Sequence, residues 1–210
     1  AFPLLEWAMN WCISSQADHF LMLHSAVIER NGGAVIMPAP PGSGKSTLCA
    51  GLVSRGWRLL SDELALLSFT DGWITPLARP ISLKNESLEV IRKFSPDAVL
   101  NEVTHHTTKG SVSHMKVPTA HLARTAQRAC PRWVIFPKYV PGADARLTAR
   151  SKAQSLLALG GNSFNYGVLG LKGFEQLSEL VSQCDCYDFE YSQLEQAVAV
   201  FDALAQELLA

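Results

Sequence analysis

The chain has 210 residues, nearly half of them apolar, which is enough to bury the core of one domain of ordinary size. Its 18 basic and 19 acidic residues leave a net charge of −1, so the sequence has neither the basic surplus of a nucleic-acid-binding protein nor an acidic tail. No apolar stretch is long enough for a membrane span, and the first residues lack the charged start of a signal peptide. Five cysteines without metal-like spacing indicate free thiols, and we expect a cytoplasmic protein.

The N-terminal part of the chain predicts a helix followed by a hairpin. Residues 2–15 are apolar with helical spacing, and residues 21–29 read as a strand. Asn31-Gly32-Gly33 is a hairpin signal, and residues 34–37 return as the partner strand. Because the hairpin leads directly into the next motif without a helical crossover, we expect a mixed sheet rather than a purely parallel one.

The segment after this hairpin has the pattern of a phosphate-binding loop. A buried strand, the turn Pro-Pro-Gly-Ser-Gly and then Lys-Ser-Thr opening a helix form the context that such a loop requires. The pattern departs from its usual form at Ala39, where glycine is expected, and Pro40 and Pro41 have no N–H to donate. The alternative is a small-residue turn that happens to precede a helix. The residues expected to hold a nucleotide are Gly42, Ser43, Gly44, Lys45, Ser46 and Thr47.

Two carboxylates follow the next predicted strand. Residues 57–60 end on Ser61-Asp62-Glu63, and a second strand runs over 64–69 to a turn at Asp71-Gly72. Carboxylates at a strand end after a phosphate loop are where magnesium is held in phosphoryl-transfer proteins. A second carboxylate beside the first can accept the proton of an attacking hydroxyl. The alternative is a solvated turn between two strands.

These motifs together resemble a known family. His24-Ser25, the glycine-rich loop and Leu60-Ser61-Asp62-Glu63 are similar in order and spacing to the catalytic half of bacterial HPr kinase/phosphorylase. The closest resemblance is to the HPr-kinase-related kinases found with exosortase protein-sorting loci. The softer motifs of this resemblance are Arg79–Asn85, Lys109–His114 and Asn162–Asn165.

The resemblance implies a single P-loop kinase domain over residues 1–210, with ATP and Mg²⁺ as its cofactors. It implies that Asp62 is the general base and that Glu63 and Ser46 lie closest to the metal, although the reverse allocation of the two carboxylates stays open. It also implies that His24 orients Asp62, whereas a lone strand histidine with a backbone partner is the plainer alternative. HPr kinases carry two aspartates where this chain has Asp62-Glu63 and a glutamate at the position of Thr47, so the resemblance leaves the acceptor open.

The rest of the chain predicts further helices and strands. Residues 85–94 form an amphipathic helix, and the polar residues 101–114 predict a mobile loop in which Lys109 contacts phosphate or substrate, or else an exposed loop of incidental polarity. His105-His106 is a poor metal site because adjacent side chains point apart in an extended chain. The remaining expectations are a strand at 132–136 followed by a loop from Pro137, helices at 151–159 and 172–181, a strand at 187–191, and a last helix capped by Ser192.

Three functions fit this sequence. The first is a kinase that transfers the terminal phosphate of ATP to a serine or another hydroxyl of a protein or small molecule. The second is an ATPase or nucleotide-dependent switch without an acceptor, and the third is a degenerate binding module. Lys45, Ser46, Asp62 and Glu63 together argue against the third. Homo-oligomerisation and a longer native chain, of which these residues are the C-terminal part, stay open.

Overall fold

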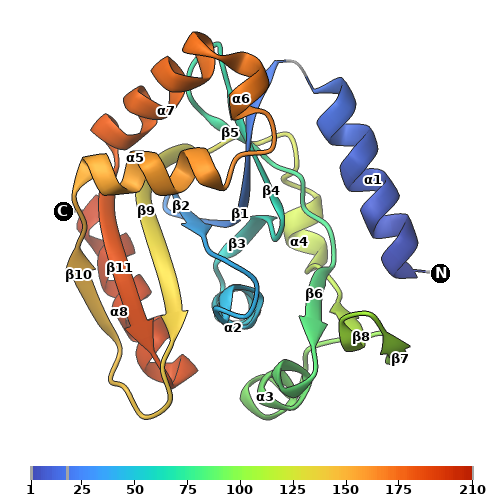
Figure 1. The fold of residues 1–210 in the computed structure, drawn as a ribbon. Coiled ribbons are helices and arrows are strands. Elements are labelled where there is room, and N and C mark those ends of the chain that lie inside the picture. Colours follow the sequence, from blue (N-terminus) through green and yellow to red (C-terminus); the bar gives the residue numbers. More distant parts are fainter. Residues whose placement is uncertain (1, 18, 210) are drawn as a thin grey trace.

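The computed structural model of the protein describes residues 2–17 and 19–209, and it is built on an eight-stranded mixed sheet (Figure 1). The strand order is β10-β11-β9-β2-β1-β4-β5, with β3 paired to β1 beside this path. The strands of this sheet are β1 (Phe20–Arg30), β2 (Gly33–Pro38), β3 (Arg58–Ser61), β4 (Leu64–Ser68), β5 (Ile74–Thr75), β9 (Cys130–Tyr139), β10 (Arg146–Ala149) and β11 (Asp185–Tyr191).

The predicted hairpin and mixed sheet are both confirmed. Asn31 and Gly32 have φ values of 53° and 82°, the left-handed pair that a two-residue turn between twisted strands requires. This turn makes β1 and β2 antiparallel, whereas β2 pairs with β9, and β9 with β11, in parallel. The phosphate-loop strand β2 therefore lies between an antiparallel and a parallel neighbour.

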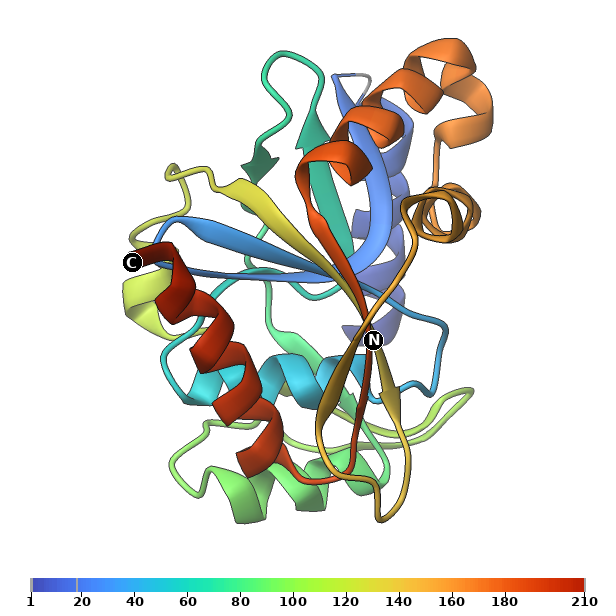
Figure 2. The ribbon, with the colours of Figure 1, turned by 90° about the vertical axis from the view of Figure 1, so that its left-hand side faces the viewer.

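Helices cover both faces of this sheet, as Figure 2 shows. Alternate residues of β2 explain the two layers, because Val35 and Met37 pack with the first face while Ala34 and Ile36 pack with the second. The helices α2 (Lys45–Ser54) and α8 (Leu194–Gln206) bury their apolar residues on the first face. On the second face lie α5 (Lys152–Gly161), α6 (Tyr166–Leu169) and α7 (Leu171–Gln183).

A second, three-stranded sheet stands beside α2 (Figure 1). Its order is β6-β8-β7, with β6 at Ile81–Lys84, β7 at Thr104–Thr107 and β8 at Gly110–Met115. The amphipathic helix α3 (Glu86–Phe94) follows β6 and buries Leu88, Ile91 and Phe94, as its spacing predicts. The expectation of a loop over residues 101–114 is wrong, because most of this segment forms the hairpin β7–β8.

Two smaller expectations also need correction. β9 runs beyond residue 136 through Pro137 to Tyr139, and this costs no ladder bond to β2 because the pairing of β9 with β2 ends at Val134. The last helix is not capped by Ser192, because the hydroxyl of that residue donates to the carbonyl of Ala143 and the helix begins after Gln193. By contrast, Ser151 caps α5 as expected, since its hydroxyl accepts from the Gln154 N–H.

The remaining elements are short or lie at the edges of the molecule. They are α1 (Phe2–Gln16), α4 (Thr119–Leu122) and the final turn η1 (Glu207–Leu209). In Figure 1 the helix α1 stands apart from the large sheet, on the side of β4 and β6. Across the described ranges 2–17 and 19–209, no helix has both the length and the apolar character to cross a membrane.

Candidate functional site

A cleft of about 640 Å³ opens between the start of α2 and the small sheet. His24, the phosphate-loop residues 40–47, Asp62 and Glu63 line it from the large sheet. Ser82 and residues 84–87, together with Lys109, form the opposite wall. The structure therefore brings the nucleotide-loop residues, the two carboxylates, His24 and Lys109 into one cleft, although they come from four separate parts of the sequence.

The phosphate loop joins the end of β2 to the start of α2 with the backbone that its glycines permit. Gly42 and Gly44 have φ values of 85° and 88°, and a Cβ atom on Gly44 would lie 2.5 Å from the Tyr191 hydroxyl. That hydroxyl donates to the Gly44 carbonyl at 2.9 Å, which fixes the last turn of the loop. Only glycine fits this position, since a side chain would meet both strain and a clash.

The N–H groups at the start of α2 make the loop an anion site. The first helical hydrogen bond runs from Leu48 N–H to Gly44 C=O, so the preceding N–H groups have no acceptor within the helix. We expected the Ser43 N–H to be among the phosphate donors, but it already donates to the Pro40 carbonyl at 3.3 Å. The cradle is thus confined to the residues from Gly44 to Thr47 and to Gly42.

The two carboxylates sit at an interruption between neighbouring strands. Both β3 and β4 pair with β1, β3 through Val27–Glu29 and β4 through Phe20–His24, and Asp62-Glu63 lies at the break between them. The Ser61 hydroxyl accepts from the N–H groups of Glu63 and Leu64 and closes the turn that ends β3. This break turns Asp62 toward the phosphate loop, where its Oδ2 accepts from the Ser46 hydroxyl at 3.3 Å.

Asp62 is buried, and its neighbours shift its pKa in opposite directions. Burial raises its pKa to about 6, although the nearby Lys45 charge and the hydrogen bonds from Ser82 N–H and Ser46 act to lower it. Its second oxygen, Oδ1, is buried and has no hydrogen-bond partner among the described residues. Burial also lowers the pKa of the Lys45 ammonium, which is only 9% exposed, and the carboxylates of Asp62 and Glu63 oppose that shift. The unpaired Asp62 oxygen can bind a cation, and the Lys45 ammonium beside it can bind an anion. The site therefore suits a ligand that contains both, such as a metal ion together with phosphate.

Glu63 is held from outside the large sheet. The side-chain amide of Asn10, on α1, donates to Glu63 Oε2, and the Arg79 guanidinium donates to Asn10 Oδ1. Since a guanidinium can only donate, Arg79 fixes which end of the Asn10 amide faces the carboxylate. The helix α1 therefore contributes one polar side chain to the site, by way of Glu63.

His24 lies at the edge of the same cleft in a half-buried position. Its ring stands 5.6 Å from that of Phe164, and its backbone N–H donates to the Asn162 carbonyl at 2.7 Å. Burial lowers its pKa, the charge of Lys45 lowers it further, and among carboxylates Glu63 raises it. Of the two carboxylates, Glu63 is the one whose charge raises the pKa of His24, whereas the resemblance implies that His24 orients Asp62.

Lys109 reaches the cleft from the tip of the β7–β8 hairpin. Asn85 holds this tip, because its N–H donates to the Ser111 carbonyl and its Oδ1 accepts from the Ser111 N–H. Asn85 has a φ of 51°, which is rare for a residue with a side chain, and a Cβ atom on Gly110 would clash with its amide. The His105 ring lies 3.0 Å from the Ser111 hydroxyl, and among the described residues neither His105 nor His106 belongs to a group of three side chains that could hold a metal.

Sequence reasoning missed the supporting residues of this site. Asn10, Arg79 and Ser82 reach the carboxylates only through tertiary contacts, and no local pattern marks them, although Arg79–Asn85 belongs to the resemblance. The residues Asn162–Asn165 of that resemblance act mainly on the backbone. The amide of Asn165 bonds the Met22 N–H and the Phe20 carbonyl and so clamps the start of β1.

The donor set of the cleft fits magnesium and a polyphosphate. The Ser46 hydroxyl, the orphan Oδ1 of Asp62 and the Glu63 carboxylate are all hard oxygen donors, which this ion prefers. Within the described part of the chain no group of three His, Cys, Asp or Glu side chains could hold a metal alone. Magnesium sites completed by substrate phosphates and water have this limited protein contribution.

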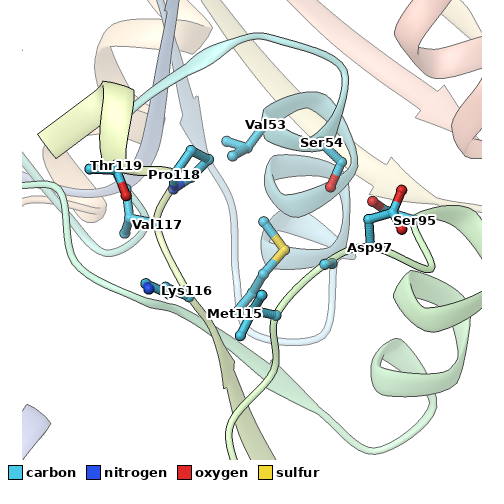
Figure 3. A pocket seen from close by; sticks show the side chains of 11 residues that line it. Val53, Ser54, Ser95, Asp97, Met115, Lys116, Val117, Pro118 and Thr119 are labelled. Atoms are coloured by element: carbon cyan, nitrogen blue, oxygen red, sulfur yellow. The ribbon is translucent and has the colours of Figure 1, made fainter.

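A second hollow of about 370 Å³ lies at the other end of α2 (Figure 3). Its wall is formed by Val53, Met115, Val117 and Pro118, with Ser54 and Asp97 near its rim. It lies at the C-terminal end of α2, near Val53 and Ser54, whereas the N–H groups that could bind an anion lie at the other end of the helix. The hollow therefore has no part in the anion cradle.

Comparisons with known proteins add little to this geometry. No protein-family model matches the chain, and no curated protein gives a significant match. Among solved structures, the HPr(Ser) kinase/phosphatase from Coxiella burnetii matches 89% of this chain and 98% of its own chain, with 13% sequence identity and a TM-score of 0.37. A likeness with so low a sequence identity and TM-score says nothing about the activity of this protein.

Proposed function

We propose that the protein is a phosphotransferase that binds a nucleoside triphosphate, ATP, with Mg²⁺ and transfers the terminal phosphate to a hydroxyl acceptor. The observation that carries this proposal is the hydrogen bond from Ser46 Oγ to Asp62 Oδ2. It joins the phosphate loop to a buried carboxylate at a strand end, which is the pairing that holds the metal in P-loop nucleotide enzymes. The motif resemblance to HPr-kinase-related kinases agrees with this assignment.

The cradle residues have the task of positioning the triphosphate. The N–H groups at the start of α2 and the Lys45 ammonium neutralise phosphate charge inside a cleft that is partly closed to water. Bound magnesium would supply further charge neutralisation on the phosphate that is transferred. Phosphoryl transfer depends on such positioning and neutralisation more than on covalent chemistry.

The Ser46 contact favours the reverse of the carboxylate allocation that the resemblance implies. Asp62 shares a hydrogen bond with the metal-binding hydroxyl, so we assign Ser46 and Asp62 to the metal and Glu63 to the proton of the acceptor hydroxyl. The side-chain amide of Asn10 donates to Glu63 Oε2 and so holds the carboxylate in position for this role. His24 lines the same cleft as Glu63, and we assign it to the stabilisation of that proton.

Calorimetry with a non-hydrolysable ATP analogue tests the binding half of this proposal. Lys45→Ala should weaken Mg²⁺-dependent binding by tenfold or more, the weight of about one charge-assisted contact to phosphate. Lys93→Ala, at an exposed site on α3 away from the cleft, should bind as the wild type does. Equal affinity of the wild type and Lys45→Ala would overturn the nucleotide site.

A further inference from the structure

The wall of the cleft that faces the phosphate loop carries two lysines that the nucleotide cradle does not use. Lys84 ends β6, and Lys109 stands at the tip of the neighbouring hairpin. In the part of the chain that the structure describes, neither side chain has a carboxylate within ion-pair distance. Both charges nevertheless act inside the cleft, because both lower the pKa of His24.

The positions of these lysines follow from the pleat of β6. Ile81 and Leu83 point into the apolar core, so Ser82 and Lys84 share the opposite face of the strand. Ser82 N–H donates to Asp62 Oδ2 at 3.2 Å, and Lys84 lies two residues further, about 6.6 Å along the strand. Asp62 therefore lies between the phosphate loop, which it contacts through Ser46, and β6, which carries Ser82 and Lys84.

The residue that holds the tip of the hairpin presenting Lys109, Asn85, is itself in a costly conformation. Asn85 has a φ of 51°, its side-chain amide donates to the Lys109 carbonyl at 3.4 Å, and it bonds both backbone groups of Ser111. Backbone strain of this kind clusters at ligand sites. An exposed loop with incidental polarity would have no use for it.

We infer that Lys84 and Lys109 form an anion subsite for the acceptor, which is a small hydroxyl compound that carries its own phosphate or carboxylate. This inference rests on the proposed function and names its substrate class. With the reacting hydroxyl at Glu63, the second charged group of the acceptor meets the lysines on the opposite wall of the same cleft. Glu86 at the rim offsets one of the two positive charges, so this wall keeps a net charge of +1 toward the acceptor.

The size of the cleft favours a small molecule over a protein segment. A hydroxy acid or a sugar phosphate carries its hydroxyl and its anion in one small molecule, and a cleft of about 640 Å³ falls in the size range of small-ligand sites. A serine side chain, by contrast, carries no anion itself. Lysine ammonium groups suit the task because they act as point charges toward phosphate or carboxylate.

The first test uses inorganic phosphate as the probe on protein saturated with Mg²⁺ and a non-hydrolysable ATP analogue. We expect one phosphate to bind the wild type and the Lys93→Ala control, and its affinity to fall roughly tenfold or more in Lys84→Ala and in Lys109→Ala. The affinity for the analogue itself should stay within about threefold in all four proteins. A fall in analogue affinity with no phosphate bound to the loaded wild type would mean that the lysines serve the nucleotide, and would overturn the inference.

The second test measures transfer of labelled phosphate to a panel of hydroxy acids, sugar phosphates, neutral polyols and serine peptides. The anionic small molecules should be the acceptors, with a KM raised about tenfold or more by Lys84→Ala or Lys109→Ala and kcat changed far less. Equal use of neutral polyols or of serine peptides would contradict the subsite.

If the ATP analogue binds none of the proteins, the proposed function is wrong. Phosphate titrated into the free wild type and the two lysine variants then tests the anion subsite separately. Equal phosphate affinity of those three proteins would overturn it.

Discussion

The side-chain amide of Asn10 donates to the carboxylate of Glu63, although the two residues are 53 positions apart and lie on separate elements. Arg79 binds the other end of the amide and so fixes its direction. Through this contact the N-terminal helix α1 controls the geometry of the carboxylate that we assign to the acceptor proton. The consequence is that a change on α1 should alter the chemistry of the site without altering nucleotide binding.

Asn10→Ala should therefore lower kcat by about 10- to 100-fold, since a hydrogen bond to a charged group is worth roughly 1.5–3 kcal/mol. The affinity for Mg²⁺ and the ATP analogue should stay unchanged because Asn10 does not line the cradle. Leu4→Ala on the exposed side of the same helix, where Leu4 is 74% exposed, is the matched control. An unchanged kcat in Asn10→Ala would mean that Glu63 does not depend on α1.

Substitutions of the two carboxylates should have different effects on phosphoryl transfer and on nucleotide binding. Glu63→Gln should abolish phosphoryl transfer, a loss of about 10²–10⁴-fold for a proton acceptor, and leave Mg²⁺-dependent nucleotide binding intact. Asp62→Asn should instead weaken the Mg²⁺ dependence of binding, because it removes the carboxylate that shares a hydrogen bond with Ser46. The opposite pattern, measured by calorimetry and by transfer rates, would exchange the two roles.

Asp62 should also make the stability of the free protein depend on pH. Its pKa is raised from 3.8 to about 6 by burial, so the folded state binds more protons than the unfolded chain between these values. The free energy of unfolding therefore falls as pH rises from about 4 to about 6, and the cost is fully present above that range. In Mg²⁺-free buffer at pH 7.5, Asp62→Asn should stabilise the protein by on the order of 1–3 kcal/mol. Glu86→Gln, at the exposed rim of the cleft, is the control.

Denaturant unfolding across this pH range measures the effect. The wild type and Asp62→Asn should have similar stability near pH 4, where Asp62 is protonated, and should diverge as pH approaches 6. Parallel curves for the two proteins at all pH values would show that Asp62 is not destabilised by its surroundings.

Two glycines of the phosphate loop should differ in their tolerance of a side chain. Gly42 and Gly44 have nearly equal φ values, but a Cβ atom on Gly42 would meet nothing within 4 Å, whereas one on Gly44 would meet the Tyr191 hydroxyl. Both alanine variants carry backbone strain of about 1–2 kcal/mol. Gly44→Ala should lose further stability and most of its nucleotide affinity, and Tyr191→Phe in the same chain should restore part of the stability by removing the hydroxyl. Equal thermal stability of Gly42→Ala and Gly44→Ala would contradict the packing of the loop on β11.

The sequence predicted those parts of the site that depend on local chemistry. The hairpin at Asn31-Gly32, the turn into α2 and the strand end at Asp62-Glu63 each require residues that are adjacent in the chain, so their patterns are legible. The hairpin β7–β8 was not legible, because His105, Ser111 and Ser113 replace the apolar alternation that marks a strand. Gly110, whose φ is 85°, was the one local signal of a turn there.

The supporting residues could not be predicted for a different reason. Asn10 and Arg79 lie 69 positions apart and meet only because α1 and the segment before β6 both pack beside the break between β3 and β4. Ser82 contributes its backbone N–H to Asp62, and a backbone donor has no sequence signature at all. Tertiary packing decides these contacts, and a single sequence does not show it.

The fate of the terminal phosphate of labelled ATP tests the proposed function most directly. The protein is incubated with Mg²⁺, labelled ATP and pooled small-molecule and protein acceptors, and free phosphate and labelled product are followed together for the wild type and Glu63→Gln. We expect labelled acceptor and little free phosphate with the wild type, and loss of the labelled product with Glu63→Gln. Steady release of free phosphate that no acceptor diverts would instead identify an ATPase and contradict the phosphotransferase.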